Sequence, residues 1–86
     1  MKIKLHKRFT KRFSKLNQKQ KVKCRHRLNL FLDDPFNPVL NNHALRGKYQ
    51  GLRSINVSGD LRAIYEMINN DIAFFIDLDS RGNLYS

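Results

Sequence analysis

Three strand-like runs follow one another in the second half of the chain, and they restrict the possible fold more than any other feature. They cover residues 51–57, 61–68 and 72–78, and each is rich in apolar side chains. Ser58-Gly59 between the first two runs predicts a tight hairpin turn. Asn69-Asn70-Asp71 predicts a second turn, made of residues that tolerate positive φ. The third run, IAFFIDL, is the most apolar, which indicates a central strand covered on both faces.

The first 32 residues predict a short strand followed by two helices. Residues 2–6 alternate charged and apolar side chains, a period-2 pattern typical of a strand. Apolar residues then recur at helical spacing, with Lys and Arg on the other faces, so an amphipathic helix is expected up to a break near Asn17. A second helix is expected over residues 19–32. The apolar faces of the two helices contain Phe9, Phe13, Leu16, Cys24, Leu28, Phe31 and Leu32.

A proline-containing loop separates the helices from the strands. Asp33-Asp34-Pro35 ends the second helix, because proline disfavours helical geometry in the residue before it, and the loop is expected to continue to residue 42. The element order is therefore β-α-α-β-β-β. This order predicts an α+β fold in which a helical hairpin packs on one face of a small, antiparallel-rich sheet. Residues 1–86 are too few for a second core, so they form a single domain.

Positive charge is concentrated at the start of the chain. The sequence contains 17 Lys or Arg and 7 Asp or Glu, for a net charge of +10. Twelve of the basic residues and none of the acidic ones fall within residues 1–32. A charge of one sign and this size attracts polyanions at long range. Nucleic acid is therefore the first candidate partner, and an acidic protein is the second.

Several classes of protein are disfavoured by what the sequence lacks. Cys24 is the only cysteine, so neither an internal disulfide nor a cysteine-based zinc site is expected. His6 and His26 have no partners at ligand spacing, which predicts no metal site, and the small core predicts no small-molecule cofactor. No apolar run is long enough to span a bilayer, and the basic N-terminus is not followed by the apolar stretch of a secretory signal. These features predict a cytoplasmic protein without a membrane partner.

The groups most able to do chemistry are concentrated between Asn41 and Glu66, which contain one histidine and three arginines. If the helices cover one face of the sheet, the other face is free. Side chains at strand ends and on that face could then converge on one ligand. These candidates are His43, Arg53, Asp60, Arg62, Arg81 and Tyr85.

Some of these candidates also have a purely structural interpretation. Asp60 follows Ser58-Gly59 and is suited to a turn. Arg53 and Arg62 could be solvated charges on strands. Arg62 could also pair with Asp60 or Glu66, which would contribute little to stability at an exposed position.

Four short segments resemble the RelE/YafQ group of bacterial toxins. The spacing H-x-L-x-G-x(3)-G-x-R at residues 43–53 is similar to the YafQ branch, as is F-L-D-D-P-x-N-P at residues 31–38. Gly59-Asp60-Leu-Arg62 and Leu84-Tyr85 resemble further segments of the family. The resemblance extends from the helical pair to the C-terminus, and it implies the same β-α-α-β-β-β fold.

The resemblance implies a ribosome-dependent mRNA endonuclease (an mRNA interferase) that inhibits translation. Such a protein is the toxin of a toxin–antitoxin module and is neutralised by a cognate antitoxin protein. It would enter the ribosomal A site and cut mRNA without a metal ion. The 2′-hydroxyl beside the scissile phosphate would attack that phosphate, leaving a 2′,3′-cyclic phosphate and a free 5′-hydroxyl. This chemistry needs a base, an acid and cations that stabilise the growing negative charge.

The resemblance also assigns roles to individual residues. His43 matches the family histidine and is the expected general acid/base, because imidazole exchanges protons near neutral pH. Asp60 matches an aspartate that would orient a histidine or contact the 2′-hydroxyl, and Arg62 matches a phosphate clamp. Tyr85 matches an aromatic ring that stacks on a base. Contacts with RNA are expected from the basic residues Arg53, Lys48, Arg46, Lys11, Lys15 and Lys19.

Two positions depart from the YafQ pattern. Asn56 and Arg81 stand where that branch has histidines, and neither side chain can act as a base at neutral pH. Arg81 can stabilise charge, which is how RelE uses an arginine in this region. Two alternatives therefore stay open. One is a catalytically weak or non-catalytic homologue that binds RNA and antitoxin. The other is a ParE-type relative that inhibits DNA gyrase, against which the motif at residues 43–53 argues.

Overall fold

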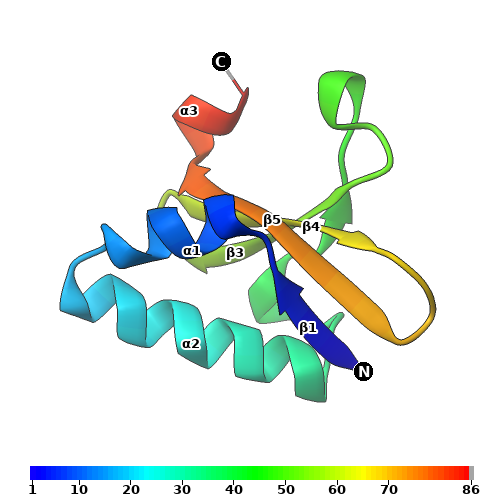
Figure 1. The fold of residues 1–86 in the computed structure, drawn as a ribbon, viewed down its shortest axis with the longest axis horizontal. Helices are drawn as coiled ribbons and strands as arrows, with labels where there is room; N and C mark the ends of the chain where they lie inside the picture. Colours follow the sequence, from blue (N-terminus) through cyan, green and yellow to red (C-terminus); the bar gives the residue numbers. More distant parts are fainter. Residues whose placement is uncertain (86) are drawn as a thin grey trace.

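The three expected strands form the centre of a five-stranded sheet (Figure 1). In the computed structural model, which describes the backbone of residues 1–85 and the side chains of residues 1–84, they are β3 (Arg53–Ser58), β4 (Leu61–Met67) and β5 (Ile72–Ser80). Both pairings, β3 with β4 and β4 with β5, are antiparallel. Gly59 turns the first hairpin at φ +43°, a conformation that glycine adopts without steric cost.

Two shorter strands complete the sheet in the order β1-β5-β4-β3-β2. β1 (Lys2–Leu5) runs parallel to β5, and β2 (His43–Ala44) pairs antiparallel with β3. The predicted α+β architecture is confirmed, with two elements in addition to those expected. One is β2, and the other is a short C-terminal helix, α3 (Arg81–Tyr85). Two 3-10 turns, η1 (Pro38–Leu40) and η2 (Gly47–Tyr49), lie in the long connection on either side of β2.

The two N-terminal helices pack on the same face of the sheet (Figure 1). They are α1 (Lys7–Ser14) and α2 (Gln18–Asp33). The break between them is explained by a capping box at the start of α2. The Asn17 side chain accepts from Gln20 N at 2.8 Å, and the Gln20 side chain accepts from Asn17 N at 3.1 Å. Two otherwise unpaired donors are satisfied in this way, so the chain starts a second helix at this point.

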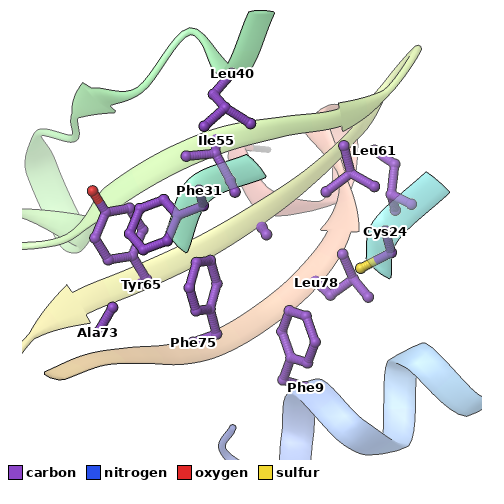
Figure 2. Packing of buried hydrophobic residues seen from close by; sticks show 12 residues of the cluster. Phe9, Cys24, Phe31, Leu40, Ile55, Leu61, Tyr65, Ala73, Phe75 and Leu78 are labelled. Atoms are coloured by element: carbon purple, nitrogen blue, oxygen red, sulfur yellow. The ribbon is translucent and has the colours of Figure 1, made fainter. Parts of the chain in front are cut away.

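The core lies between the helical pair and the sheet, and aromatic rings dominate it (Figure 2). Phe31 of α2 is fully buried, with its ring centroid 4.9 Å from that of Tyr65 and 5.2 Å from that of Phe75. Phe9 of α1 contacts Phe75 at 5.9 Å. Edge-to-face rings at these separations are favourable beyond the burial of their surface. The aromatic cluster therefore ties both helices to β4 and β5.

Two local predictions were wrong. The strand β5 is not covered on both faces, because Ala73 and Phe75 are buried while Ile72, Phe74 and Ile76 are only half-buried. Leu32 is 40% exposed instead of lying in the core. The predicted turn at residues 69–71 is present between β4 and β5, and it forms without a positive φ. The Asn69 side chain accepts hydrogen bonds from the backbone N–H groups of Asp71 and Ile72.

The Cys24 thiol should be unreactive in the folded protein. Burial raises the pKa of this thiol to about 11, against the opposing effect of the Arg25 charge. Since only the thiolate is nucleophilic, we expect disulfide reagents to react at least about 100-fold more slowly with folded than with unfolded protein at pH 8. The contrast should shrink as the pH rises toward the pKa of the folded thiol. Rapid labelling of the folded chain at pH 8 would contradict this burial.

Candidate functional site

A pocket of about 330 Å³ lies beside β2, at the end of the sheet where β4 begins and β5 ends. Its lining residues come from the loop before β2, from β2 and the residue after it, from β4, and from α3. They are Asn41, His43, Leu45, Arg62 and Arg81. The structure thus brings together three of the predicted site residues, His43, Arg62 and Arg81. Figure 1 shows why, since β2 and α3 are far apart in the sequence but rise from the same side of the sheet.

His43 is held in a defined orientation by the backbone just before it. Its Nδ1 lies 2.8 Å from the carbonyl oxygen of Asn41. A carbonyl can only accept a hydrogen bond, so Nδ1 carries the proton in this contact. In the neutral ring, Nε2 is then the free acceptor. The imidazole is therefore arranged to take a proton at Nε2.

Asn41 supplies that carbonyl from an unusual backbone conformation. Its φ is +44°, and it is the one non-glycine residue with positive φ in the described part of the chain. Asparagine tolerates this left-handed region better than most residues. No signal in the sequence marked Asn41 as part of the site, although its position after a 3-10 turn is one where Asn and Gly are common.

Substitutions at Asn41 should separate backbone conformation from side-chain chemistry. Asn41→Gly is expected to leave stability within about 0.5 kcal/mol of the wild type, because glycine adopts positive φ freely. Asn41→Val is expected to cost about 1–3 kcal/mol, because a β-branched residue is strained there. Urea denaturation of the two variants checks the difference. Equal stabilities would show that the loop does not hold this conformation.

Arg62 is fixed by the β3–β4 hairpin. Its Nη1 donates to the carbonyl oxygens of Gly59 and Leu61 at 2.8 and 3.2 Å. Among the described residues, no carboxylate lies within ion-pair distance of Arg62, so the suggested pairing with Asp60 or Glu66 is absent. The positive charge of its guanidinium is therefore not balanced by a carboxylate of the described residues.

Arg81 enters the pocket as the first residue of α3. Its backbone N–H donates to the carbonyl of Asp60 at 2.8 Å, which ties the start of α3 to the hairpin turn. The side chain of Arg81 is exposed and has no hydrogen bond or ion pair to a described residue. Asp60 therefore contributes its backbone, and its exposed carboxylate does not line the pocket.

The helix α3 depends on residues that sequence reasoning missed. Asp79 Oδ1 accepts from Ser80 N at 2.8 Å and from the Asn83 side chain at 3.2 Å. Ser80 Oγ accepts from Asn83 N at 3.2 Å. Since aspartate and serine favour helix starts, the Asp79-Ser80 pair was the available signal for a short helix. These contacts determine where Arg81 lies.

Arg53, another predicted site residue, does not line the pocket. Arg53 on β3 is directly opposite Tyr65 on β4, and Tyr65 belongs to the core. Its guanidinium donates to Asn42 Oδ1 at 2.9 Å and lies 5.4 Å from the centroid of the exposed Phe36 ring. The side chain of Tyr85 lies outside the described part of the chain. Asn56 is directly opposite Arg62 on β3, and its buried Oδ1 has no hydrogen-bond partner.

The remaining basic candidates lie around the pocket or on the helices. Arg46 and Lys48 are exposed in the segment after β2, with Lys48 Nζ 5.3 Å from the centroid of the Tyr49 ring. Exposed lysines on α1 and α2 form part of two other hollows, one along α1 and one between α2 and the β3–β4 hairpin. They include Lys11, Lys15 and Lys19. The structure thus presents a histidine–arginine pocket and, apart from it, basic hollows on the helices.

The described residues offer neither a metal site nor a membrane span. No group of three or more His, Cys, Asp or Glu in residues 1–84 is arranged to hold a metal ion. None of the described helices has the length and apolarity needed to cross a membrane.

The strand order and the helical pair on one face define a fold known from solved structures, that of the RelE/YafQ toxins. YafQ from E. coli strain BL21(DE3) matches with a TM-score of 0.78 and 24% identity over 98% of this chain and 97% of that chain. The E. coli DinJ-YafQ toxin-antitoxin complex matches with 0.75 and 22% over 98% and 96%. An archaeal RelE-RelB complex from Pyrococcus horikoshii OT3 matches with 0.75 and 20% over 94% of each chain. At these levels of sequence identity, the similarity shows a shared fold and nothing more. No family model matches the sequence, and no curated protein does either.

Proposed function

We propose that this protein is the toxin of a toxin–antitoxin pair and that it cleaves mRNA on the ribosome, in the cytoplasm. The observation that carries the proposal is the pocket in which His43, with Nδ1 bonded to a carbonyl, lies beside Arg62 and Arg81. No Asp or Glu lines this pocket. A base among unpaired cations suits the cleavage of a phosphodiester and suits few other reactions. The RelE/YafQ fold supports the same class of function.

The chemistry follows from the three side chains. His43 Nε2 takes the proton of the 2′-hydroxyl, and the 2′ oxygen then attacks the adjacent phosphorus. Arg62 and Arg81 stabilise the additional negative charge on the phosphate oxygens in the transition state. The bond from phosphorus to the 5′ oxygen breaks, and that oxygen is protonated from water, because no second acid among the described side chains lines the pocket. The products are a 2′,3′-cyclic phosphate and a 5′-hydroxyl end.

Arg81 acts in this scheme by charge and not by proton transfer. Because a guanidinium stays protonated at neutral pH, His43 is the one proton-transfer group that the described side chains contribute to the pocket. Asn56, on the strand beside Arg62, can donate or accept a hydrogen bond but cannot move a proton. The proposed enzyme therefore works chiefly by charge stabilisation and by the position of the 2′-hydroxyl.

The partners in the proposal match the charge distribution. Residues 1–32 carry twelve Lys or Arg and no acid, and exposed lysines of α1 and α2 form part of hollows separate from the pocket. Such a surface can bind ribosomal RNA while the pocket receives the mRNA. It can equally bind an acidic segment of a cognate antitoxin. The E. coli DinJ-YafQ structure is a toxin–antitoxin complex and supports a partner of this kind.

The proposal is tested by inducing the protein in cells and mapping RNA ends. We expect translation to stop and mRNA to be cut within codons on ribosomes, leaving 5′-hydroxyl ends. A message with a single 2′-deoxy nucleotide at the cut site should stay intact in a purified translation system. DNA damage with intact mRNA would instead indicate a gyrase inhibitor of the ParE type. Salt-sensitive ribosome binding without cleavage would indicate a non-catalytic homologue.

A further inference from the structure

Arg12 differs from the other basic residues of the N-terminal half. Its Nε lies 2.9 Å from Asp77 Oδ1, and its Nη1 lies 2.7 Å from Asp79 Oδ2. The two carboxylates are only 12% and 22% exposed. Among the described residues, this is the one Lys or Arg side chain that forms ion pairs. A single cation on α1 thus forms ion pairs with both acidic residues of β5.

One of these carboxylates lies next to the proposed catalytic pocket. In the β4–β5 pairing, Asp79 is directly opposite Arg62. Side chains directly opposite each other in an antiparallel pair share a face, with their Cβ atoms about 5 Å apart. An arginine and an aspartate in that relation are well placed to form an ion pair. Yet Arg62 donates only to the carbonyls of Gly59 and Leu61.

The reason is that both oxygens of Asp79 already have partners. Oδ2 accepts from Arg12, and Oδ1 accepts from Ser80 N and from the Asn83 side chain. The Asp79 carboxylate therefore has a cationic partner on α1, and it also accepts hydrogen bonds from the residues that start α3. Removing Arg12 would leave Asp77 and Asp79 without an ion-pair partner among the described residues, and Arg62 is directly opposite Asp79 on the neighbouring strand.

We propose that Arg12 is a positioning residue that holds Asp79 in an ion pair, so that Arg62 forms no ion pair with Asp79 and can bind a phosphate group of RNA. The role of Arg12 is electrostatic and indirect, because Arg12 does not line the pocket. The inference rests on the proposed function for the identity of the ligand. The exchange of ion-pair partners can be observed without any ligand.

The binding test uses a 2′-O-methyl RNA oligonucleotide, which cannot be cleaved, and fluorescence anisotropy at fixed low salt. Arg12→Gln is expected to weaken binding about tenfold, because Asp79 then pairs with Arg62. Arg8→Gln removes an exposed arginine of the same helix that has no ion pair, and it should weaken binding only about twofold. Arg12→Lys keeps the cation and should bind like the wild type. Melting curves check that each variant is folded.

The specific signal is that the effect of Arg12→Gln depends on two other residues. In an Asp79→Asn background or an Arg62→Gln background, Arg12→Gln should weaken binding no more than Arg8→Gln does. A tenfold loss in all three backgrounds would mean that Arg12 contacts RNA itself, and it would overturn the inference.

A crystal structure of Arg12→Gln separates this inference from the proposed function. We expect an Arg62–Asp79 ion pair within about 4 Å. If Arg62 stays on the Gly59 and Leu61 carbonyls, the inference is wrong whatever the RNA assay shows. If the new ion pair forms but the wild type does not bind the oligonucleotide, the control of Arg62 by Arg12 stands and the proposed RNA ligand is wrong.

Discussion

Replacing His43 by alanine is expected to lower the rate of mRNA cleavage by about 10²- to 10⁴-fold. Among the side chains that the structure describes, His43 is the one proton-transfer group that lines the pocket, and its Nδ1 contact with Asn41 leaves Nε2 free to act as the base. The side chain is exposed, so the substitution should change the free energy of unfolding by no more than about 0.5 kcal/mol. Single-turnover cleavage of ribosome-bound mRNA measures the loss directly.

The matched control is His26→Ala. His26 is also exposed, but it lies on α2, remote in sequence from the pocket and not part of its lining. It should cut at the wild-type rate. Cleavage that survives in His43→Ala would assign the reaction to charge stabilisation by Arg62 and Arg81 alone. Cleavage that is lost equally in both variants would point to a general effect of histidine removal on folding or ribosome binding.

The arrangement of the sheet could be predicted because its signals are local. Strands 53–58, 61–67 and 72–80 have strand-like composition and are separated by turn residues, so their existence and neighbours followed from the sequence. The element β2 contains two residues, too few for any periodicity. The helix α3 contains five residues and exists through the hydrogen bonds of Asp79 and Ser80.

The candidate site was predicted in part, and its limits have a physical origin. His43, Arg62 and Arg81 were expected to converge because strand ends on one side of a sheet lie together, and they line one pocket. Arg53 does not join them because the register places it opposite the core residue Tyr65. The register of the β3–β4 pair depends on the exact turn and on the register shift between Asn56 and Ser58, and the sequence does not reveal an irregularity of this kind.

The same reasoning explains why Arg12 was not recognised. Its sequence context, a basic helix face, is identical to that of Arg8 and Lys11. Only the position of α1 beside β5 gives it two carboxylate partners. Long-range ion pairs of this type join residues far apart in the chain, and local patterns carry no information about them.

Phe31→Ala is expected to destabilise the protein by about 3–5 kcal/mol. Phe31 is fully buried and is in edge-to-face contact with both Tyr65 and Phe75, so its removal leaves a cavity between α2 and the sheet. Small domains unfold with a free energy of about 5–15 kcal/mol. The substitution should therefore remove much of the stability of a chain this short, and the native fold should be only marginally populated at 37 °C.

Phe36→Ala provides the control for that loss, because it deletes the same side chain from a position that is 66% exposed. It removes only a contact with the Arg53 guanidinium, which is 5.4 Å from the ring centroid, and should cost no more than about 1 kcal/mol. Urea denaturation measures both variants against the wild type. Equal costs at the two positions would mean that Phe31 does not hold α2 on the sheet. A loss confined to Phe31→Ala would show that this ring is important for holding α2, and the basic residues on it, against the sheet.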